Sequence, residues 1–287
     1  SFYGTIIVAF YPFAIGIMFL MPLDVLFSTA FFYGLNRNEL ALSEAMNLGN
    51  LHLNEQAFGA FLGLCFFVFW IGRRHFKGVF KKAFKKKVDL DEGEPIPYRV
   101  AVWGLFFGLI LFSFLLNKAG MELWLAGIFA VLFLITPIIT TRIRAEAGIF
   151  VHAFHWQAPR YVLITALGTR RLGPQNLTTL SVCFFNRDYR PQQMPHQLEA
   201  FKISEQANIK NKRMLFAILI ATVFGVVFAF WVQLHLYYKF GADSGYFGRW
   251  ALGYGREFSG RLRNWILYPT NTDRAGLLFM GIAFSVM

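Results

Sequence analysis

Ionisable side chains that fall inside apolar stretches are the residues of this sequence that could do chemistry. Asp24 follows Pro22 inside an apolar run that extends from Phe2 to Leu35. A charged group in a bilayer is energetically costly, so such a residue is a candidate for a substrate or ion pathway. A helix broken near Pro22 would expose backbone groups to a ligand beside Asp24. The alternative is that Asp24 only caps the helix that follows.

A second group of candidates lies in the segment TTRIRAEAGIFVHAFHWQAPR. Arg142 and Glu146 are four residues apart and would pair on a continuous helix. Because Glu146 is the only acid among five arginines between residues 123 and 185, we expect it to be paired, in a partly buried polar pocket. It would titrate if the protein moves protons, and otherwise it forms a structural salt bridge. The candidate substrate or ion pathway residues are Asp24, Arg142, Arg144, Glu146, His152 and His155.

The sequence gives no support for an enzyme or for a bound cofactor. His152 and His155 have a spacing compatible with one metal ion, but no third ligand follows at a suitable interval, so we predict no metal site. No G-x-x-x-x-G-K-[ST] loop, G-x-S-x-G elbow, H-E-x-x-H pair or C-x-x-C motif occurs. Cys65 and Cys183 lie in apolar stretches and are expected to be buried thiols. We therefore predict a protein that is not an enzyme and has no cofactor.

The composition is that of a membrane protein. Hydrophobic residues make up 56% of the 287 residues, charged residues only 15%, and phenylalanine occurs 35 times. The net charge of +12 is concentrated in loops, where membrane topology explains it, so we do not expect nucleic acid as a partner. Because the chain begins at Ser1 and stops within an apolar run, we expect it to be an internal fragment of a longer polypeptide.

Apolar runs of about 20 residues predict an all-α, polytopic transmembrane protein, with residues 1–287 forming a single transmembrane domain. About five full spans are expected, and a partial span follows Arg274. The full spans are Phe2–Pro22, Phe58–Gly72, Val100–Leu116, Leu123–Thr141 and Met214–Tyr238. The prolines predict that the first helix breaks near Pro22, so that Leu23–Leu35 does not continue it smoothly.

Lysine and arginine counts predict which loops face the cytoplasm. Residues 36–56 contain one basic residue, 73–99 contain nine, 117–122 contain one, and 142–213 contain eleven. We therefore expect 73–99 and 142–213 to be cytoplasmic. By the alternation of spans, residues 239–274 form an external loop, although that segment contains six basic residues.

The segment from Arg160 to Phe185 leaves two interpretations open. It is apolar but is interrupted by Arg170, Arg171, Gly173 and Pro174. Two half-helices that enter the membrane and return would need neighbouring protein to satisfy their backbone groups. A peripheral cytoplasmic pair of helices is the alternative.

The basic segment RRHFKGVFKKAFKKK, within 73–99, has the pattern of an amphipathic helix. Phe76, Phe80 and Phe84 recur every four residues, with lysines on the other face. Such a helix lies at the membrane surface and binds anionic lipid headgroups. It could instead only set the topology and solubility of the loop. The expected lipid-binding residues are Lys77, Lys81, Lys82, Lys85 and Lys86.

Five stretches of the sequence carry a resemblance to a known family: FYPFAIGIMFLMPLDVLFSTAFFYGL, RIRAEAGI, LGPQNLTTL, FNRDYRPQQMPHQLEAFKI and NWILYPTNTD. Together they resemble an uncharacterised prokaryotic family of large multi-pass membrane proteins that is similar to oligopeptide transporters. The resemblance covers most of the chain. It implies a secondary transporter scaffold in the cytoplasmic membrane of a prokaryote, and it supplies no substrate.

We therefore expect a secondary membrane transporter of a small peptide-like or other organic solute, with proton coupling as an option. The alternative is an accessory or structural subunit of a larger membrane assembly, and a homo-oligomer also stays open. In a transporter, Asp24, Arg144 and Glu146 should converge on one polar cavity. In an accessory subunit they should face different environments.

Overall fold

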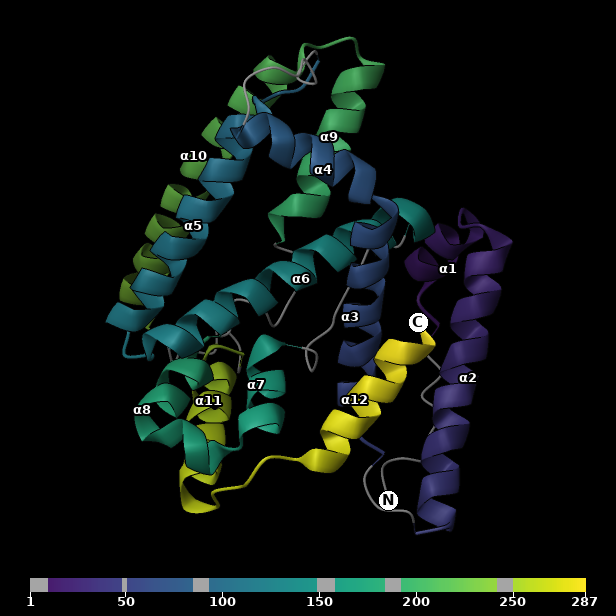
Figure 1. Cartoon of the computed structure of the whole chain (residues 1–287), viewed down its shortest axis with the longest axis vertical. Coiled ribbons are helices and arrows are strands. Elements are labelled where there is room, and N and C mark those ends of the chain that lie inside the picture. The colour runs from purple at the N-terminus through teal and green to yellow at the C-terminus, as the bar shows by residue number, and fades with distance from the viewer. Residues whose placement is uncertain (1–9, 48–50, 85–92, 149–157, 184–191, 242–249) are drawn as a thin grey trace.

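The computed structural model describes residues 10–47, 51–84, 93–148, 158–183, 192–241 and 250–287 (Figure 1). Within these ranges all regular structure is helical, as predicted. The helices are α1 Pro12–Phe19, α2 Leu23–Ala45, α3 Leu53–Ile71, α4 Arg73–Phe84, α5 Tyr98–Lys118, α6 Leu123–Ala147, α7 Pro159–Leu167, α8 Thr169–Val182, α9 Gln193–Gln206, α10 Asn211–Phe240, α11 Trp250–Leu267 and α12 Arg274–Val286.

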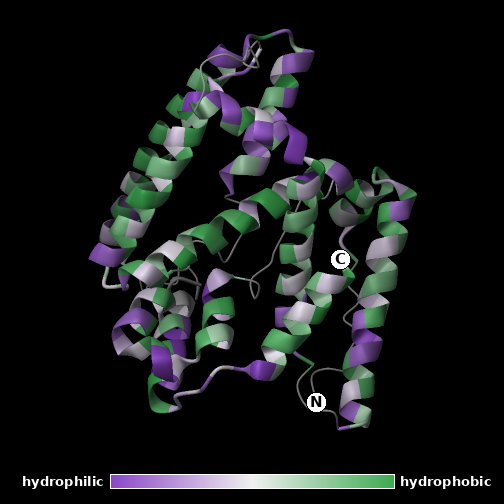
Figure 2. Cartoon of the chain, viewed as in Figure 1, coloured by the Kyte–Doolittle hydropathy of each residue, from purple (hydrophilic) through white to green (hydrophobic). Residues whose placement is uncertain are grey.

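Among the described residues, four helices, α3, α5, α6 and α10, are long and apolar enough to cross a membrane. Figure 2 shows apolar residues along most of their length and hydrophilic residues gathered at α4, α9, α8 and α11. At about 1.5 Å per residue, the 19 residues of α3 span about 28 Å and the 30 residues of α10 about 45 Å. Four of the five expected full spans therefore correspond to helices. The first expected span includes residues 2–9, which lie outside the described residues.

The break in the first apolar run occurs where the sequence predicts it. α1 ends at Phe19, and α2 begins at Leu23 with Pro22 as its N-cap. Proline has no N–H to donate within a helix, and its ring crowds the preceding turn. The prediction that Leu23–Leu35 does not continue the first helix smoothly is thus confirmed.

In Figure 1, α3, α5 and α10 lie closer to the long axis of the molecule, whereas α6 lies obliquely across it. α4 and α9 lie at one end, which we call the α4/α9 end, and α8 and α11 lie at the other, the α8/α11 end. Arg144, close to the C-terminal end of α6, pairs with Glu199 of α9. At the start of α6, the Glu122 backbone N–H donates to Asn176 Oδ1 of α8 at 2.9 Å. α8 therefore lies at the start of α6, and α9 lies at its end.

A tightly packed core surrounds the first half of α6. Leu125 and Phe129 of α6 pack with Leu163 of α7 and with Leu177 and Leu180 of α8, and each of these side chains is at most 3% exposed. Burial of such apolar side chains stabilises the contact by roughly 1.5–3 kcal/mol each. This packing holds α7 and α8 against a spanning helix.

α3 and α12 form a parallel pair in close contact. A Cβ atom at Gly59 would overlap the carbonyl oxygen of Met280, and one at Gly63 would lie 2.7 Å from the Cβ of Met287. Small residues four positions apart are the pattern by which membrane helices approach closely. The short apolar helix α12 is therefore held along the face of a spanning helix.

Replacement of Gly59 tests this contact. The Gly59→Ala variant should lower the free energy of unfolding by about 1–3 kcal/mol, because the backbone of Met280 cannot move aside without shifting α12. A matched control is Gly108→Ala in α5, where an added Cβ meets nothing within 4 Å. Thermal unfolding in detergent should separate the two variants. Equal stabilities would contradict the close contact of α3 and α12.

Candidate functional site

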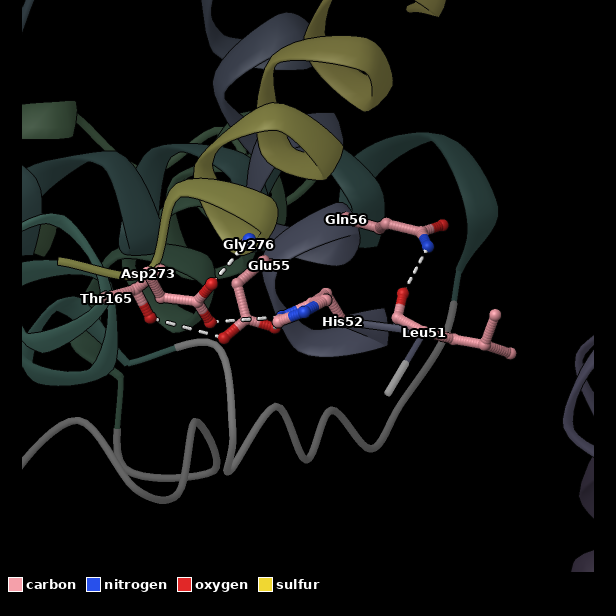
Figure 3. A network of polar contacts seen from close by, with 7 residues as sticks. All are labelled: Leu51, His52, Glu55, Gln56, Thr165, Asp273 and Gly276. Carbon is pink, nitrogen blue, oxygen red and sulfur yellow. Dashed lines mark hydrogen bonds and ion pairs between the residues drawn. The ribbon is translucent and has the colours of Figure 1, made fainter. Parts of the chain in front are cut away.

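A cluster of polar side chains lies where α3 and α12 begin and α7 ends (Figure 3). We call this cluster the polar junction, and its residues are His52, Glu55, Thr165 and Asp273. The four residues come from three helix ends that are distant in the sequence. Ionisable groups that meet beside a helix long and apolar enough to cross a membrane are candidates for function.

The imidazole of His52 lies between the two carboxylates of the junction. His52 Nδ1 is 3.3 Å from Asp273 Oδ2 and 3.9 Å from Glu55 Oε2. Its ring stacks on Phe279 with 5.6 Å between centroids, and its side chain is 11% exposed. The charge of this group thus depends on whether the shielded imidazole is protonated.

Further contacts position both carboxylates. Asp273 caps α12, because its Oδ1 accepts a hydrogen bond from the Gly276 backbone N–H at 3.0 Å. The Asp273 backbone N–H donates to the Thr165 carbonyl oxygen at 2.9 Å. The Thr165 hydroxyl donates to Glu55 Oε1 at 3.2 Å. Thr165 therefore ties the end of α7 to the starts of both α3 and α12.

The segment before α12 is fixed to the turn between α7 and α8. Gly168 has a φ of 76°, and a Cβ there would lie 2.6 Å from the carbonyl carbon of Asn271, so only glycine fits. The Thr270 backbone N–H donates to Thr169 Oγ1 at 2.7 Å. The Arg170 backbone N–H donates to the Thr270 carbonyl oxygen at 3.1 Å. We call residues 270–273 the strap.

An imidazole flanked by two carboxylates is suited to holding and releasing a proton. Histidine is the side chain whose ordinary charge change falls between pH 5 and 8. Carboxylates beside it can share the proton or bind a polar ligand. In the part of the chain that the structure describes, no group of three or more His, Cys, Asp or Glu side chains is arranged to hold a metal ion.

Arg142 and Glu146 form the expected ion pair, but the prediction that this pair lies in a partly buried polar pocket is wrong. The Arg142 and Glu146 side chains are 47% and 58% exposed, so Glu146 does not lie in a partly buried pocket. The reason is helical geometry, because Arg144 lies on nearly the opposite face of α6 from this pair. α9 packs on the Arg144 face, where Glu199 forms the ion pair with Arg144.

Glu199 is a partner that the sequence analysis did not find. The hydrogen bond from Arg144 holds the pKa of the Glu199 carboxyl below its ordinary value. His196 Nδ1 lies 3.7 Å from Glu199 Oε2 and lowers that pKa further when it is protonated. The Arg144–Glu199 pair therefore stays charged at neutral pH and links α6 to α9.

The expected convergence of Asp24, Arg144 and Glu146 on one polar cavity is not observed. Arg144 and Glu146 have different partners on different faces of α6. Asp24 is exposed in the first turn of α2, where Pro22 occupies the N-cap position and no side chain caps the helix. Asp24 therefore acts on α2 only through its charge near the helix start. His152 and His155 lie outside the described residues.

The basic helix α4 has the expected amphipathic character. Phe80 and Phe84 are 53% and 69% exposed, whereas Ala83 beside them is buried. Phe84 also packs edge-on against Trp103 of α5 with 5.8 Å between ring centroids. The lysines Lys77 and Lys81 are exposed and Lys82 is half-buried, whereas Lys85 and Lys86 fall outside the described residues.

None of the four residues of the polar junction is among the candidates predicted from the sequence. Asp273 is separated by one residue from the apolar run that begins at Ala275, which is an N-cap signal. Glu55 stands three residues after His52 at the start of an apolar run. These signals could have marked the individual residues, but no local pattern indicates that they meet.

The whole chain, residues 1–287, matches the model of a family described as "Family of unknown function (DUF6785)", and the chain belongs to that family. No curated protein and no solved structure matches the chain. Because the family description carries no activity, the resemblance to oligopeptide transporters stays a prediction.

Substitutions at Asp273 test the polar junction. Asp273→Ala should lower the free energy of unfolding by about 1–2 kcal/mol, because the cap of α12 and the contact with His52 are both lost. Asp273→Asn keeps an oxygen that can cap α12 and should cost less. Asp24→Ala is the control, since this exposed acid caps no helix and its loss should change stability by less than about 1 kcal/mol. Thermal unfolding measures all three, and an Asp273→Ala variant as stable as the wild type would refute the arrangement.

Proposed function

We propose that this DUF6785 member is a secondary transporter that moves a small peptide-like or other organic solute across the cytoplasmic membrane of a prokaryote. The observation that supports it most is the polar junction, where two carboxylates and a histidine meet at three helix ends beside spanning helices. Transporters of known mechanism bind substrates and ions at such interruptions of membrane helices.

The path of α7 and α8 supports the same proposal. α6 has 25 residues and is about 37 Å long, enough to cross the apolar part of a bilayer. α8 contacts the start of α6, whereas α9 contacts its end. We infer that residues 158–183 form a re-entrant segment that enters from the side of α9 and returns to it. Apolar side chains of α7 and α8 pack in one core with those of α6, which supports protein cover for the irregular backbone between them.

The α4/α9 end is proposed to face the cytoplasm. Nine basic residues in 73–99 favour this orientation by the positive-inside rule. α4 then lies at the inner membrane surface, with the exposed Phe80 and Phe84 in the interface and Lys77, Lys81 and Lys82 toward anionic lipid headgroups. The polar junction belongs to the external half of the protein.

Proton coupling is proposed for the polar junction in place of Glu146. Glu146 is exposed and paired with Arg142, and no second carboxylate forms part of that ion pair. Glu55 is 20% exposed and faces both His52 and Thr165. If a proton bound to His52, Glu55 or Asp273, the charge of that side chain would change, and so would the ion pairs among the three residues.

A second candidate function is an accessory subunit of a larger membrane assembly. It is favoured by the separate surroundings of Asp24, Arg144 and Glu146. It is also favoured by α10, in which no residue is buried within the described structure. An apolar helix of this kind can face either lipid or another membrane protein.

Single-cysteine labelling tests the proposed topology. Cys65 and Cys183 are 6% and 4% exposed, so they should react slowly and leave a low background. Cysteines at Lys77 and Glu205 should react with a membrane-impermeant thiol reagent only from the cytoplasmic side. A cysteine at Gln175 of α8 should react only from outside. Labelling of Gln175→Cys from the same side as Lys77→Cys would make α7 and α8 a peripheral cytoplasmic pair.

Uptake into proteoliposomes tests the function. The full-length protein should accumulate labelled short peptides or small organic acids when an inward proton gradient is imposed, and not without it. Glu55→Gln should abolish the response to the gradient, whereas Glu146→Gln should transport as the wild type does. Unfolding curves show whether each variant is folded. Absence of gradient-driven uptake, together with a stoichiometric co-purifying membrane protein, would favour the accessory subunit.

A further inference from the structure

We propose that a pocket between α8 and the strap binds an anionic oxygen group, a carboxylate or phosphate, on the transported solute. This inference rests on the proposed function and names the class of substrate. We call the site the arginine pocket. It has a volume of about 400 Å³ and is lined by Leu167, Arg170, Arg171, Asn271, Thr272 and Arg274.

The positive charge of the arginine pocket has no counter-charge in the described structure. Arg170, Arg171 and Arg274 form no ion pair among the described residues, and no acidic side chain lines the pocket. Asp273 stands between two lining residues, but its Oδ1 accepts from Gly276 and its Oδ2 faces His52. The carboxylate of Asp273, next to Arg274 in the sequence, thus makes its contacts in the polar junction.

Three guanidinium groups around one pocket indicate the chemistry of the ligand. Arginine presents a rigid fork of N–H donors that matches the two oxygens of a carboxylate or phosphate. The amide of Asn271 and the hydroxyl of Thr272 add neutral donors, and Leu167 provides an apolar wall. The volume lies within the range of about 300–1,000 Å³ that is typical of small-molecule sites.

The backbone of the arginine pocket is held in place before any ligand binds. The strap approaches Gly168 so closely that no side chain fits between them. Hydrogen bonds between Thr270 and Thr169, and between Thr270 and Arg170, fix the strap to the start of α8. A site on fixed backbone loses less conformational freedom on binding, which favours affinity.

The arginine pocket adjoins the polar junction through two chain segments. Thr272 and Arg274 line the pocket on either side of Asp273, and Leu167 follows Thr165 by two residues. An anion in the pocket therefore lies next to the carboxylate that His52 contacts.

The test uses the full-length protein in nanodiscs of phosphatidylcholine, without any transport step. Succinate, inorganic phosphate and tri-alanine are titrated while thermal unfolding is followed, with succinamide as the uncharged probe. At least one anion should raise the unfolding temperature in a saturable way, as a ligand of the folded state does, and succinamide should not. The triple variant Arg170→Gln, Arg171→Gln and Arg274→Gln should weaken the apparent Kd by at least about tenfold.

A matched control removes two exposed arginines of α11 at the same end of the bundle, through Arg256→Gln and Arg263→Gln. This variant should bind as the wild type does. Absence of any anion effect, or equal losses in the triple variant and the control, would overturn the arginine pocket as a specific site.

Nanodiscs that contain phosphatidylglycerol distinguish the two sources of the anionic group. A solute site predicts that the soluble anion still binds with a similar apparent Kd in those discs. If phosphatidylglycerol alone stabilises the wild type and the triple variant abolishes that effect, the anion is a lipid headgroup and the substrate assignment falls. If the anion binds but proteoliposome uptake fails, the arginine pocket is supported and the proposed transport function is wrong.

Discussion

The lack of water inside an apolar bundle is the constraint on which the rest of this structure depends, because a helix end that is buried there must find protein partners for its backbone groups. The strap supplies hydrogen-bond acceptors to the starts of two helices, α8 and α12. Thr270 accepts the hydrogen bond of the Arg170 backbone N–H at the start of α8, and Asp273 accepts that of Gly276 at the start of α12. At the end of α7, the Gly168 N–H donates to the Ile164 carbonyl oxygen at 2.8 Å. The interruption between α7 and α8 is therefore stable beside a spanning helix.

The pairing of α3 with α12 depends on two different interactions along its length. At the start of the helices, His52 and Asp273 bring polar groups together, whereas farther along Gly59 and Gly63 allow the backbones to approach. Dispersion forces across such a close contact are the main attraction between membrane helices, since lipid is as apolar as their side chains. The carboxylates of the polar junction are consequently mounted on rigid helices, which keeps a binding or proton-transfer geometry intact.

Local features of this fold could be predicted from the sequence, and contacts between distant segments could not. Apolar runs predict α3, α5, α6 and α10 because length and hydropathy are properties of a single segment. Pro22 predicts the break before α2 for the same reason. The contact of Glu55 with Thr165 depends on how α3 and α7 pack, and no spacing rule encodes it. The prediction that Glu146 is partly buried failed for the same reason. Tertiary packing decides which face of α6 is covered by α9, and the sequence pattern of α6 does not show it.

The arginines of α7 and α8 change the charge balance across the proposed membrane. The basic-residue count places Arg160, Arg170 and Arg171 in a cytoplasmic loop. In the structure, however, α8 contacts the start of α6, whereas α9 contacts the end of α6. The orientation then depends mainly on the nine basic residues of 73–99, which lie in a short loop where the positive-inside rule is strongest. Arginines at the proposed external end need a different explanation, because the positive-inside rule does not favour them there. The proposed anion site gives one, since a bound carboxylate or phosphate would balance their charge.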